Sequence, residues 1–391
     1  MSNYLQEAEA LFDYSQALRR DFHRHPELGF KEVRTAGIVA RELNELGLEV
    51  TSGIAETGVV ALVEGERPGP VILLRFDMDA LPIQEETGAE YASQNPGVMH
   101  ACGHDAHTAI GLTVARLLHA RRSELSGTAK LVFQPAEEGL GGAKRMVKEG
   151  VLADPKPDVA LALHVWNDKP FGWIGVTEGP AMSASEVFKI KITGKGAHAA
   201  SPHEGIDPLT AASQIVLALQ TIVARNVSPV DTAVLSVTML HAGDAFNVIP
   251  NYVTLGGTIR TYKSGTRAMI LKRLEQVVQG ICQAMNCEAA IEMRGVTPAV
   301  SNHPEVTAKV QQVVRDLFPP EVLDTGERTM GSEDMAFMMD DIPGCYFFVG
   351  SANPSRGLDA PHHNPKFDID ERVLPRAAGL MASVAARFLA A

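Results

Sequence analysis

The N-terminal part of the chain alternates between two hydrophobic patterns. Residues 7–22 and 33–46 space their apolar side chains three and four positions apart, which predicts amphipathic helices. Residues 58–65, 70–77 and 158–166 are short apolar runs, which predict strands buried on both faces. Because buried strands separated by helices are typical of parallel sheets, we expect an α/β fold with a mainly parallel sheet.

A different order of elements begins near residue 184. The patterns predict a strand at 186–196, a helix at 208–224, strands at 232–240 and 252–262, a helix at 267–285 and a strand at 287–295. This βαββαβ order is that of ferredoxin-like domains. The α/β pattern then resumes, so we expect residues 1–183 and 297–391 to form one discontinuous domain into which residues 184–296 are inserted.

Composition narrows the class of protein. The chain has 391 residues, of which 45% are hydrophobic, and a formal net charge of -12. An acidic chain without a basic tract does not suit neutralisation of phosphates, so we expect no nucleic-acid partner. We also expect no membrane partner, because no apolar run reaches membrane-spanning length and the N-terminus lacks a signal-peptide pattern. Four scattered cysteines suggest free thiols and a cytoplasmic protein.

Polar side chains follow the predicted strands at their carboxyl ends. Asp77 and Asp79 follow the strand at 70–77, Glu137 and Glu138 follow a strand that ends near residue 135, and His164 closes the next strand. In open α/β sheets, ligands bind at this edge. The sequence therefore predicts a functional site there.

The segment MHACGHDAHTA, residues 99–109, allows three interpretations: a metal site, a thiol nucleophile with its base, or a polar turn before a helix. Taken alone, a cysteine is usually a small buried hydrophobe and a histidine a hydrogen-bond partner. Together, five donors spread along the chain suit a metal site, namely Cys102, His104, Glu138, His164 and one of His362 and His363. In the pair at 137–138, one carboxylate can then bind metal while the other takes a proton from water.

Nine ordered motifs extend this interpretation over nearly the whole chain: HRHPELGFKE, RFDMDALPIQEETG, MHACGHDAHTA, FQPAEEGLGGAKRM, GKGAHAASPHEGIDP, FNVIP, GTIRTY, GSEDMAFM and HHNPKFDIDE. With these motifs the chain resembles the M20-type metallo-amidohydrolases. The similarity is to the branch that contains hippurate hydrolases, auxin-conjugate hydrolases and bacterial N-acyl-amino-acid amidohydrolases.

The resemblance implies two divalent metal ions per subunit, which could be zinc, manganese, cobalt or nickel. The implied ligands are Cys102, His104, Glu138, His164 and His363, with the thiolate able to bridge both ions. The last ligand precedes an Asn-Pro pair in this family, which selects His363, although the doubled histidine leaves His362 as the alternative.

The resemblance also implies roles around the metal ions. Glu137 is the general base, and Asp79 orients a ligand histidine and raises its basicity. His198 of the inserted domain donates to the developing oxyanion. Asn247 and Arg260 contact the substrate, since an arginine fork suits a free carboxylate. The inserted domain would then act as a lid and a dimerisation domain.

The expected activity is metal-dependent hydrolysis of N-acyl amino acids by a homodimer or a higher oligomer. Three alternatives stay open. The first is a dipeptidase or carboxypeptidase on the same scaffold. The second is a cysteine hydrolase with Cys102 as nucleophile, which leaves the carboxylates and the distant histidines unexplained. The third is a binding protein that has lost its chemistry.

Overall fold

The computed structural model describes residues 4–390, which fold into two compact units. Unit 1 comprises the described residues up to Ala181 together with Val300–Arg328 and the segment from Asp334 onwards. Unit 2 comprises Met182–Ala299 and Thr329–Glu333. The hydrophobic pattern gives no indication that Thr329–Glu333 belongs with the inserted segment.

Unit 1 is built on an eight-stranded sheet with the strand order β1-β2-β4-β3-β5-β16-β6-β15. The four central strands are β4 (Ser126–Gln134), β3 (Arg67–Asp77), β5 (Val159–Pro170) and β16 (Gly344–Ala352), and neighbouring strands among them are parallel. Towards one edge, β2 (Gly58–Glu64) and β1 (Glu49–Ile54) pair antiparallel. The predicted α/β fold with a mainly parallel sheet is confirmed.

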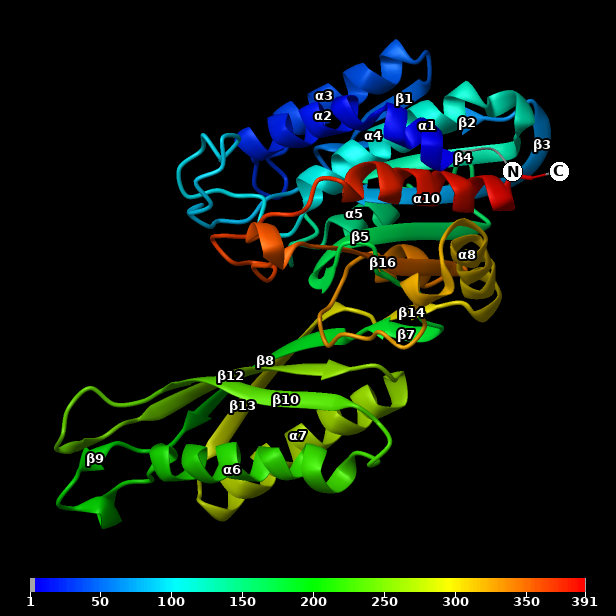
Figure 1. Ribbon diagram of the computed structural model, residues 1–391. Coiled ribbons are helices and arrows are strands. Elements are labelled where there is room, and N and C mark those ends of the chain that lie inside the picture. The colour runs from blue at the N-terminus through cyan, green and yellow to red at the C-terminus, as the bar shows by residue number, and fades with distance from the viewer. Residues whose placement is uncertain (1–3, 391) are drawn as a thin grey trace. The chain divides into compact units, whose positions relative to one another are not determined.

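Helices pack on this sheet (Figure 1), and their apolar side chains share one core with those of the strands. Nearly all of α4 (His104–Ala120) is buried, and it contacts β3 as well as α10 (Val373–Phe388). The other elements of unit 1 are α1 (Tyr4–Ala10), α2 (Phe12–Arg24), α3 (Val33–Glu45), η1 (Arg122–Glu124), α5 (Gly142–Lys148), β6 (Ile174–Gly175), β7 (Gly179–Met182), β14 (Val300–Asn302), α8 (Pro304–Leu317), η3 (Pro320–Val322), β15 (Leu323–Asp324), α9 (Ala336–Met339) and η4 (Pro354–Arg356). Because α4 is covered on most sides, its first residues are held rigidly against the sheet.

Unit 2 is the ferredoxin-like domain. Its sheet has the order β10-β12-β8-β13, and all neighbours are antiparallel. The strands are β8 (Ala184–Thr193), β10 (Ala233–His241), β12 (Tyr252–Thr261) and β13 (Glu288–Thr297), and the helices are α6 (Pro208–Asn226) and α7 (Ser264–Ala284). A small ladder joins β9 (Ala197–His198) to β11 (Val248–Ile249), and η2 (Pro202–Glu204) lies between β9 and α6. Helices and sheet share one apolar core.

None of the helices within residues 4–390 combines the length and the apolar character that crossing a membrane requires.

Candidate metal centre and active site

The predicted metal ligands come together at the carboxyl edge of the central strands of unit 1. Three donor atoms, from Cys102, His104 and His164, lie within 4.8 Å of one another. A second group with the same limit joins Cys102 to Glu138 and His363. Since the two groups share the thiol, the five side chains form one continuous cluster of candidate metal ligands.

The two histidines of the first group are oriented by backbone carbonyls. His104 donates from Nδ1 to the carbonyl of Asp79 at 2.9 Å, with Oδ1 of the same residue at 3.2 Å. His164 donates from Nδ1 to the carbonyl of Val165 at 2.6 Å, and its Nε2 lies 3.5 Å from Sγ of Cys102. Fixing Nδ1 in this way leaves Nε2 of each ring as the nitrogen that can bind a metal ion.

An unpartnered nitrogen supports a metal at this place. Nε2 of His104 is buried and has no hydrogen-bond partner among the described residues, although Oδ2 of Asp77 lies 3.6 Å from it. Burying such an atom unpaired costs about 1–3 kcal/mol, which a cation would offset. With thiol, imidazole and carboxylate donors around it, the group suits zinc and similar divalent ions. The residues therefore fit the metal ions that the sequence implies.

The structure separates the two neighbouring histidines. His362 accepts the backbone N–H of Asn167 through Nε2 at 3.1 Å and packs against Trp166, with ring centroids 4.8 Å apart. Burial and the nearby His363 lower the pKa of His362 to about 3. His363 has a φ of 65°, and its Nε2 lies 3.2 Å from Oε1 of Glu138. Nδ1 of His362 lies 3.8 Å from Sγ of Cys102, but only His363 joins a candidate ligand group, with Cys102 and Glu138.

Protons compete with metal ions in this cluster. Hydrogen bonding to Cys102 and Glu138 raises the pKa of His363 to about 10. Burial acts to lower the pKa of His104, but Asp77 and Cys102 outweigh it and hold this pKa well above the usual range. Burial and the charge of Glu138 raise the pKa of the Cys102 thiol. Because metal ligands must lose these protons, metal binding here releases protons and strengthens as the pH rises.

Glu137 lies beside the ligand group. One carboxylate oxygen of Glu137 is within 4.8 Å of donor atoms from His104 and Glu138, and its Oε1 accepts the backbone N–H of Asp334 at 3.4 Å. The loop is tightly turned, since Ala136 has a φ of 54° and the N–H of Gly139 donates to the carbonyl of Glu137 at 2.5 Å. The neighbouring carboxylate of Glu138 is the one that faces His363. Adjacent residues thus present one carboxylate to the ligands and one beside them.

A buried chain behind the ligands is a part of the site that the sequence analysis did not identify. Asp77, at the end of β3, lies 2.5 Å from Nδ1 of His107 through Oδ1 and 2.7 Å from Nη1 of Arg75 through Oδ2. His107 in turn accepts the backbone N–H of Val165 through Nε2 at 2.9 Å. This series of side-chain contacts fixes the backbone next to His164. The spacing of two aspartates in DMD is the signal for it, but it points equally to Asp79.

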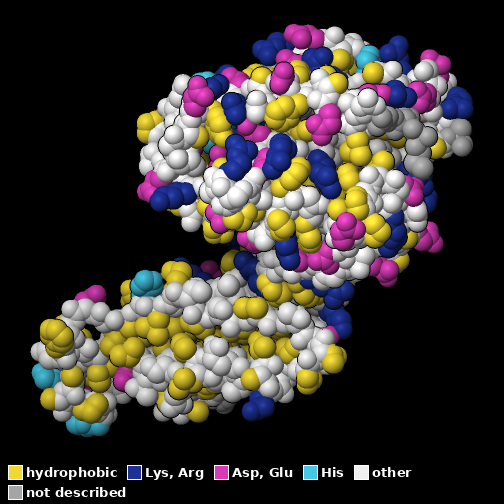
Figure 2. All heavy atoms as spheres, in the orientation of Figure 1, with side chains coloured by type: hydrophobic (Ala, Val, Ile, Leu, Met, Phe, Trp, Pro, Cys, Tyr) yellow, Lys and Arg dark blue, Asp and Glu magenta, His cyan; other side chains and the backbone are white. Residues whose placement is uncertain are grey.

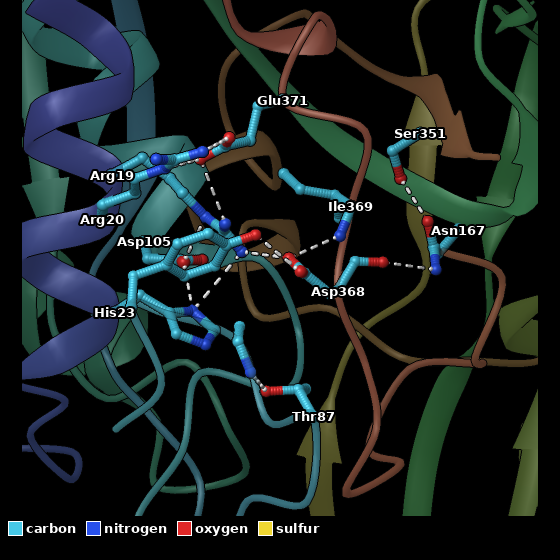
Figure 3. Close-up of polar contacts among 12 residues, drawn as sticks. Arg19, Arg20, His23, Thr87, Asp105, Asn167, Ser351, Asp368, Ile369 and Glu371 are labelled. Carbon is cyan, nitrogen blue, oxygen red and sulfur yellow. Dashed lines mark hydrogen bonds and ion pairs between the residues drawn. The ribbon is translucent and has the colours of Figure 1, made fainter. Parts of the chain in front are cut away.

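The first turn of α4 is also held by a buried ionic network (Figure 3). Arg19 of α2 has a fully buried side chain, which lies 2.8 Å from Asp105 through Nε and 2.7 Å from Asp368 through Nη2. His23 lies 2.7 Å from the same oxygen of Asp105. Because Asp105 follows His104 directly, α2 and the segment before α10 hold this ligand in place.

The predicted substrate residues belong to unit 2 and do not all lie together. His198 and Asn247 are exposed and line one open pocket of about 1090 Å³. Their loops are joined, since the N–H of Ala199 donates to the carbonyl of Asn247 at 2.9 Å. Tyr252 also lines this pocket, whereas Arg260 lies eight residues further along β12. At a rise of about 3.3 Å per residue, this places Arg260 about 26 Å from Tyr252.

An α/β sheet that carries cysteine, histidine and carboxylate donors at the carboxyl ends of its strands is the architecture of a metal-dependent hydrolase. Residues 73–387 match the model of peptidase family M20/M25/M40, and the chain belongs to this family.

Named relatives agree with this class. The chain is 42% identical over 382 residues to IAA-amino acid hydrolase ILR1-like 4 of Arabidopsis thaliana, covering 97% of this chain and 86% of the relative. It is 39% identical over 381 residues to thermostable carboxypeptidase 1 of Saccharolobus solfataricus, covering 96% and 95%. A crystal structure of a dinuclear metal-binding M20 peptidase from Bacillus subtilis superposes with a TM-score of 0.86 at 36% identity, covering 97% of this chain and 99% of that one. The protein is a metal-dependent enzyme that hydrolyses amide bonds.

Proposed function

We propose that the enzyme hydrolyses the amide bond of N-acyl amino acids and releases a carboxylic acid and a free amino acid. The observation that carries the proposal is the carboxylate of Glu137 beside the donors of His104 and Glu138. A base at this distance from a metal position can take a proton from a water molecule held there. The similarity to an IAA-amino acid hydrolase supports an amide between an acyl group and an amino acid.

Two divalent ions would be held by Cys102, His104, Glu138, His164 and His363, with the thiolate shared. When bound, such ions lower the pKa of water and polarise the carbonyl group of the substrate. Asp79 orients His104 for this purpose through the contacts to Nδ1.

The side chains of the protein then move the protons. Glu137 takes a proton from water, and the oxygen of that water attacks the acyl carbon. His198 donates a hydrogen bond to the carbonyl oxygen as negative charge develops on it. The bond between carbon and nitrogen breaks, and Glu137 returns the proton to the leaving amine. Arg260 holds the free carboxylate of the amino acid, and Asn247, which lies beside His198, contacts the substrate from the same side as His198.

We further propose that the enzyme acts as a homodimer through unit 2, with higher oligomers as an extension of the same contacts. Because His198 lies at one end of β12 and Arg260 near the other, a single copy of unit 2 cannot place both on one small substrate. A second subunit would supply the missing group.

The surface of unit 2 suits such a contact. Hydrophobic side chains gather on its visible face (Figure 2). Met239, Leu240, Phe246 and Val248 of unit 2 are exposed. The edge strand β10 also presents unpaired backbone groups.

The free thiols of Cys102, Cys282, Cys287 and Cys345 are consistent with a reducing compartment, and we propose the cytoplasm.

The principal test replaces the proposed base. Glu137→Gln keeps the shape of the side chain and removes its basicity. We expect metal content to stay at the wild-type level while kcat falls by about 10²–10⁴-fold. Elemental analysis and turnover are measured on the same sample. Loss of metal instead would show that the roles of Glu137 and Glu138 are exchanged.

The substrate class is tested with a panel of N-acetyl, N-benzoyl and indole-acyl amino acids, with unblocked and N-blocked dipeptides beside them. The carboxypeptidase relative makes peptide hydrolysis the second candidate, and faster cleavage of dipeptides would select it. Chelation followed by restoration with zinc, manganese, cobalt or nickel identifies the active metal. A cysteine hydrolase would survive the chelator, but the raised pKa of the Cys102 thiol is the opposite of what a nucleophile needs.

Mixed subunits test the dimer. His198→Ala and Glu137→Ala proteins are each expected to be inactive. If His198 acts on the partner's site, a mixed dimer contains one site with both residues intact and regains activity. Failure of the mixture to regain activity, with exchange of subunits verified, would contradict the shared site.

A further inference from the structure

The segment His25–Glu32 lies against both loops that carry the proposed catalytic carboxylates. The N–H of Ala80, next to Asp79, donates to the carbonyl of Glu27 at 2.8 Å. On the other loop, a Cβ added at Gly29 would lie 3.0 Å from Cα of Ala136 and 2.7 Å from Cδ1 of Leu140. The segment thus packs directly on the backbone of the loop that contains Glu137.

Glu32 makes the polar contact between the segment and this loop. Its side chain is buried, Oε1 accepts the backbone N–H of Ala136 at 2.9 Å, and Oε2 accepts the hydroxyl of Thr57 at 2.6 Å. Both carboxylate oxygens are therefore engaged, one by the backbone of the loop and the other by Thr57.

The hydrogen bond from the loop to Glu32 is made by Ala136, a residue with an unfavourable backbone conformation. Ala136 has a φ of 54°, a conformation that costs a residue with a side chain about 1–2 kcal/mol. Such a conformation persists only when its surroundings hold it. Glu137 is the next residue, so the direction of its side chain depends on the peptide group that Glu32 holds.

We propose that Glu32 is a positioning residue for Glu137, acting through the N–H of Ala136. The inference rests on the proposed role of Glu137 as the base. The role of Glu32 depends on the length of its side chain and not on its charge, because both of its partners are uncharged donors.

Two substitutions separate the effect of the length of the Glu32 side chain from the effect of its charge. Glu32→Gln keeps the length and can still accept from Ala136, so kcat is expected to stay at the wild-type level. Glu32→Asp keeps the charge but is one methylene too short to hold both partners. We expect kcat to fall by about 10–100-fold, since displacement of a catalytic group by about 1 Å has effects of that size. KM and metal content should not change.

A matched pair controls for damage to a buried carboxylate. Glu42 of α3 is buried and accepts from Tyr14 and Arg116, each at 2.9 Å, without contacting the site. Glu42→Gln and Glu42→Asp should leave kcat unchanged even if they lower the melting temperature.

A second readout does not depend on turnover. Hydrogen–deuterium exchange of the amides in residues 134–142 should accelerate in Glu32→Asp and stay at the wild-type rate in Glu32→Gln. Equal exchange in all three proteins would overturn the inference, whether or not N-acyl amino acids are substrates. If the wild type hydrolyses none of them, the proposed function fails while this measurement still decides the role of Glu32.

Four kinetic outcomes would also overturn the inference. They are wild-type kcat in Glu32→Asp, equal losses of kcat in the Gln and Asp variants, loss of metal together with kcat in Glu32→Asp, and a loss of kcat in the Glu42 pair as large as that in Glu32→Asp. If Glu32→Asp does not fold, a loss of kcat in Glu32→Gln is sufficient to refute the role.

Discussion

Gly103, between the proposed ligands Cys102 and His104, is the position at which one added methyl group should disturb the proposed metal centre most directly. Its backbone has φ 91° and ψ 13°, in the left-handed region. A Cβ at this position would lie 2.4 Å from Cγ2 of Val165, whereas carbon atoms in ordinary contact are about 3.5–4.0 Å apart. Gly103→Ala therefore combines an unfavourable backbone with a steric overlap.

The two costs can be separated. The left-handed backbone costs alanine about 1–2 kcal/mol, and overpacking by one methyl group costs about 1–3 kcal/mol. We expect Gly103→Ala to lower the free energy of unfolding of unit 1 by about 2–5 kcal/mol. In a Val165→Ala background the overlapping atom is gone, so only the backbone cost of about 1–2 kcal/mol should remain.

The measurement uses the tryptophans. The chain has two, Trp166 and Trp173, and both lie in unit 1, so their fluorescence in urea reports on this unit. Excess chelator keeps metal binding from adding to stability. The wild type, both single variants and the double variant form a cycle with an expected coupling of about 1–3 kcal/mol. Additivity within about 0.5 kcal/mol would refute the contact with Val165. A cost of Gly103→Ala that stays below about 1 kcal/mol would refute the backbone argument.

Three further changes probe the surroundings of the site. Asp79→Asn should weaken metal binding by about 10–100-fold, measured by competition with a chelator, because it disturbs an orienting contact. His363→Ala should lower the metal content per subunit in elemental analysis, whereas His362→Ala should retain both ions; the reverse result would exchange their roles. Arg19→Met should destabilise unit 1 by about 3–5 kcal/mol at pH 7 in the fluorescence assay, because it strands buried carboxylates. Although burial opposes it, Arg19 holds the pKa of Asp105 well below its usual range, so this deficit should shrink below about pH 4 as the carboxyl group becomes protonated. A deficit that grows on acidification would contradict that assignment.

The periodicity of the sequence was sufficient to predict the fold because each pattern has a local cause. The apolar run at 70–77 became the buried end of β3, and the order of elements after residue 184 became the sheet and helices of unit 2. The antiparallel pairing of β1 with β2 was not predicted, because hydrophobic runs do not specify the direction of pairing.

The site was predictable in part. The residue types of Cys102 and His164 pointed to a metal centre, and the structure brings their donor atoms together. His164 was expected to close its strand, but β5 continues to Pro170. The choice between His362 and His363 depends on the N–H of Asn167, which is far away in the sequence. The contact of Glu32 with Ala136 was likewise hidden, because no spacing rule connects them. Such contacts arise only from tertiary packing.

The sharing of Cys102 between two ligand groups has a consequence for the synthesis of the chain. The thiol meets His164 after a short stretch of sequence but meets His363 only after unit 2 and most of the remaining chain have been made. On the ribosome, the main segment of unit 2 emerges whole while the sheet of unit 1 still lacks β16. The group that contains His363 therefore closes last, and a nascent chain that has not reached His363 offers only Cys102 and Glu138 of that group.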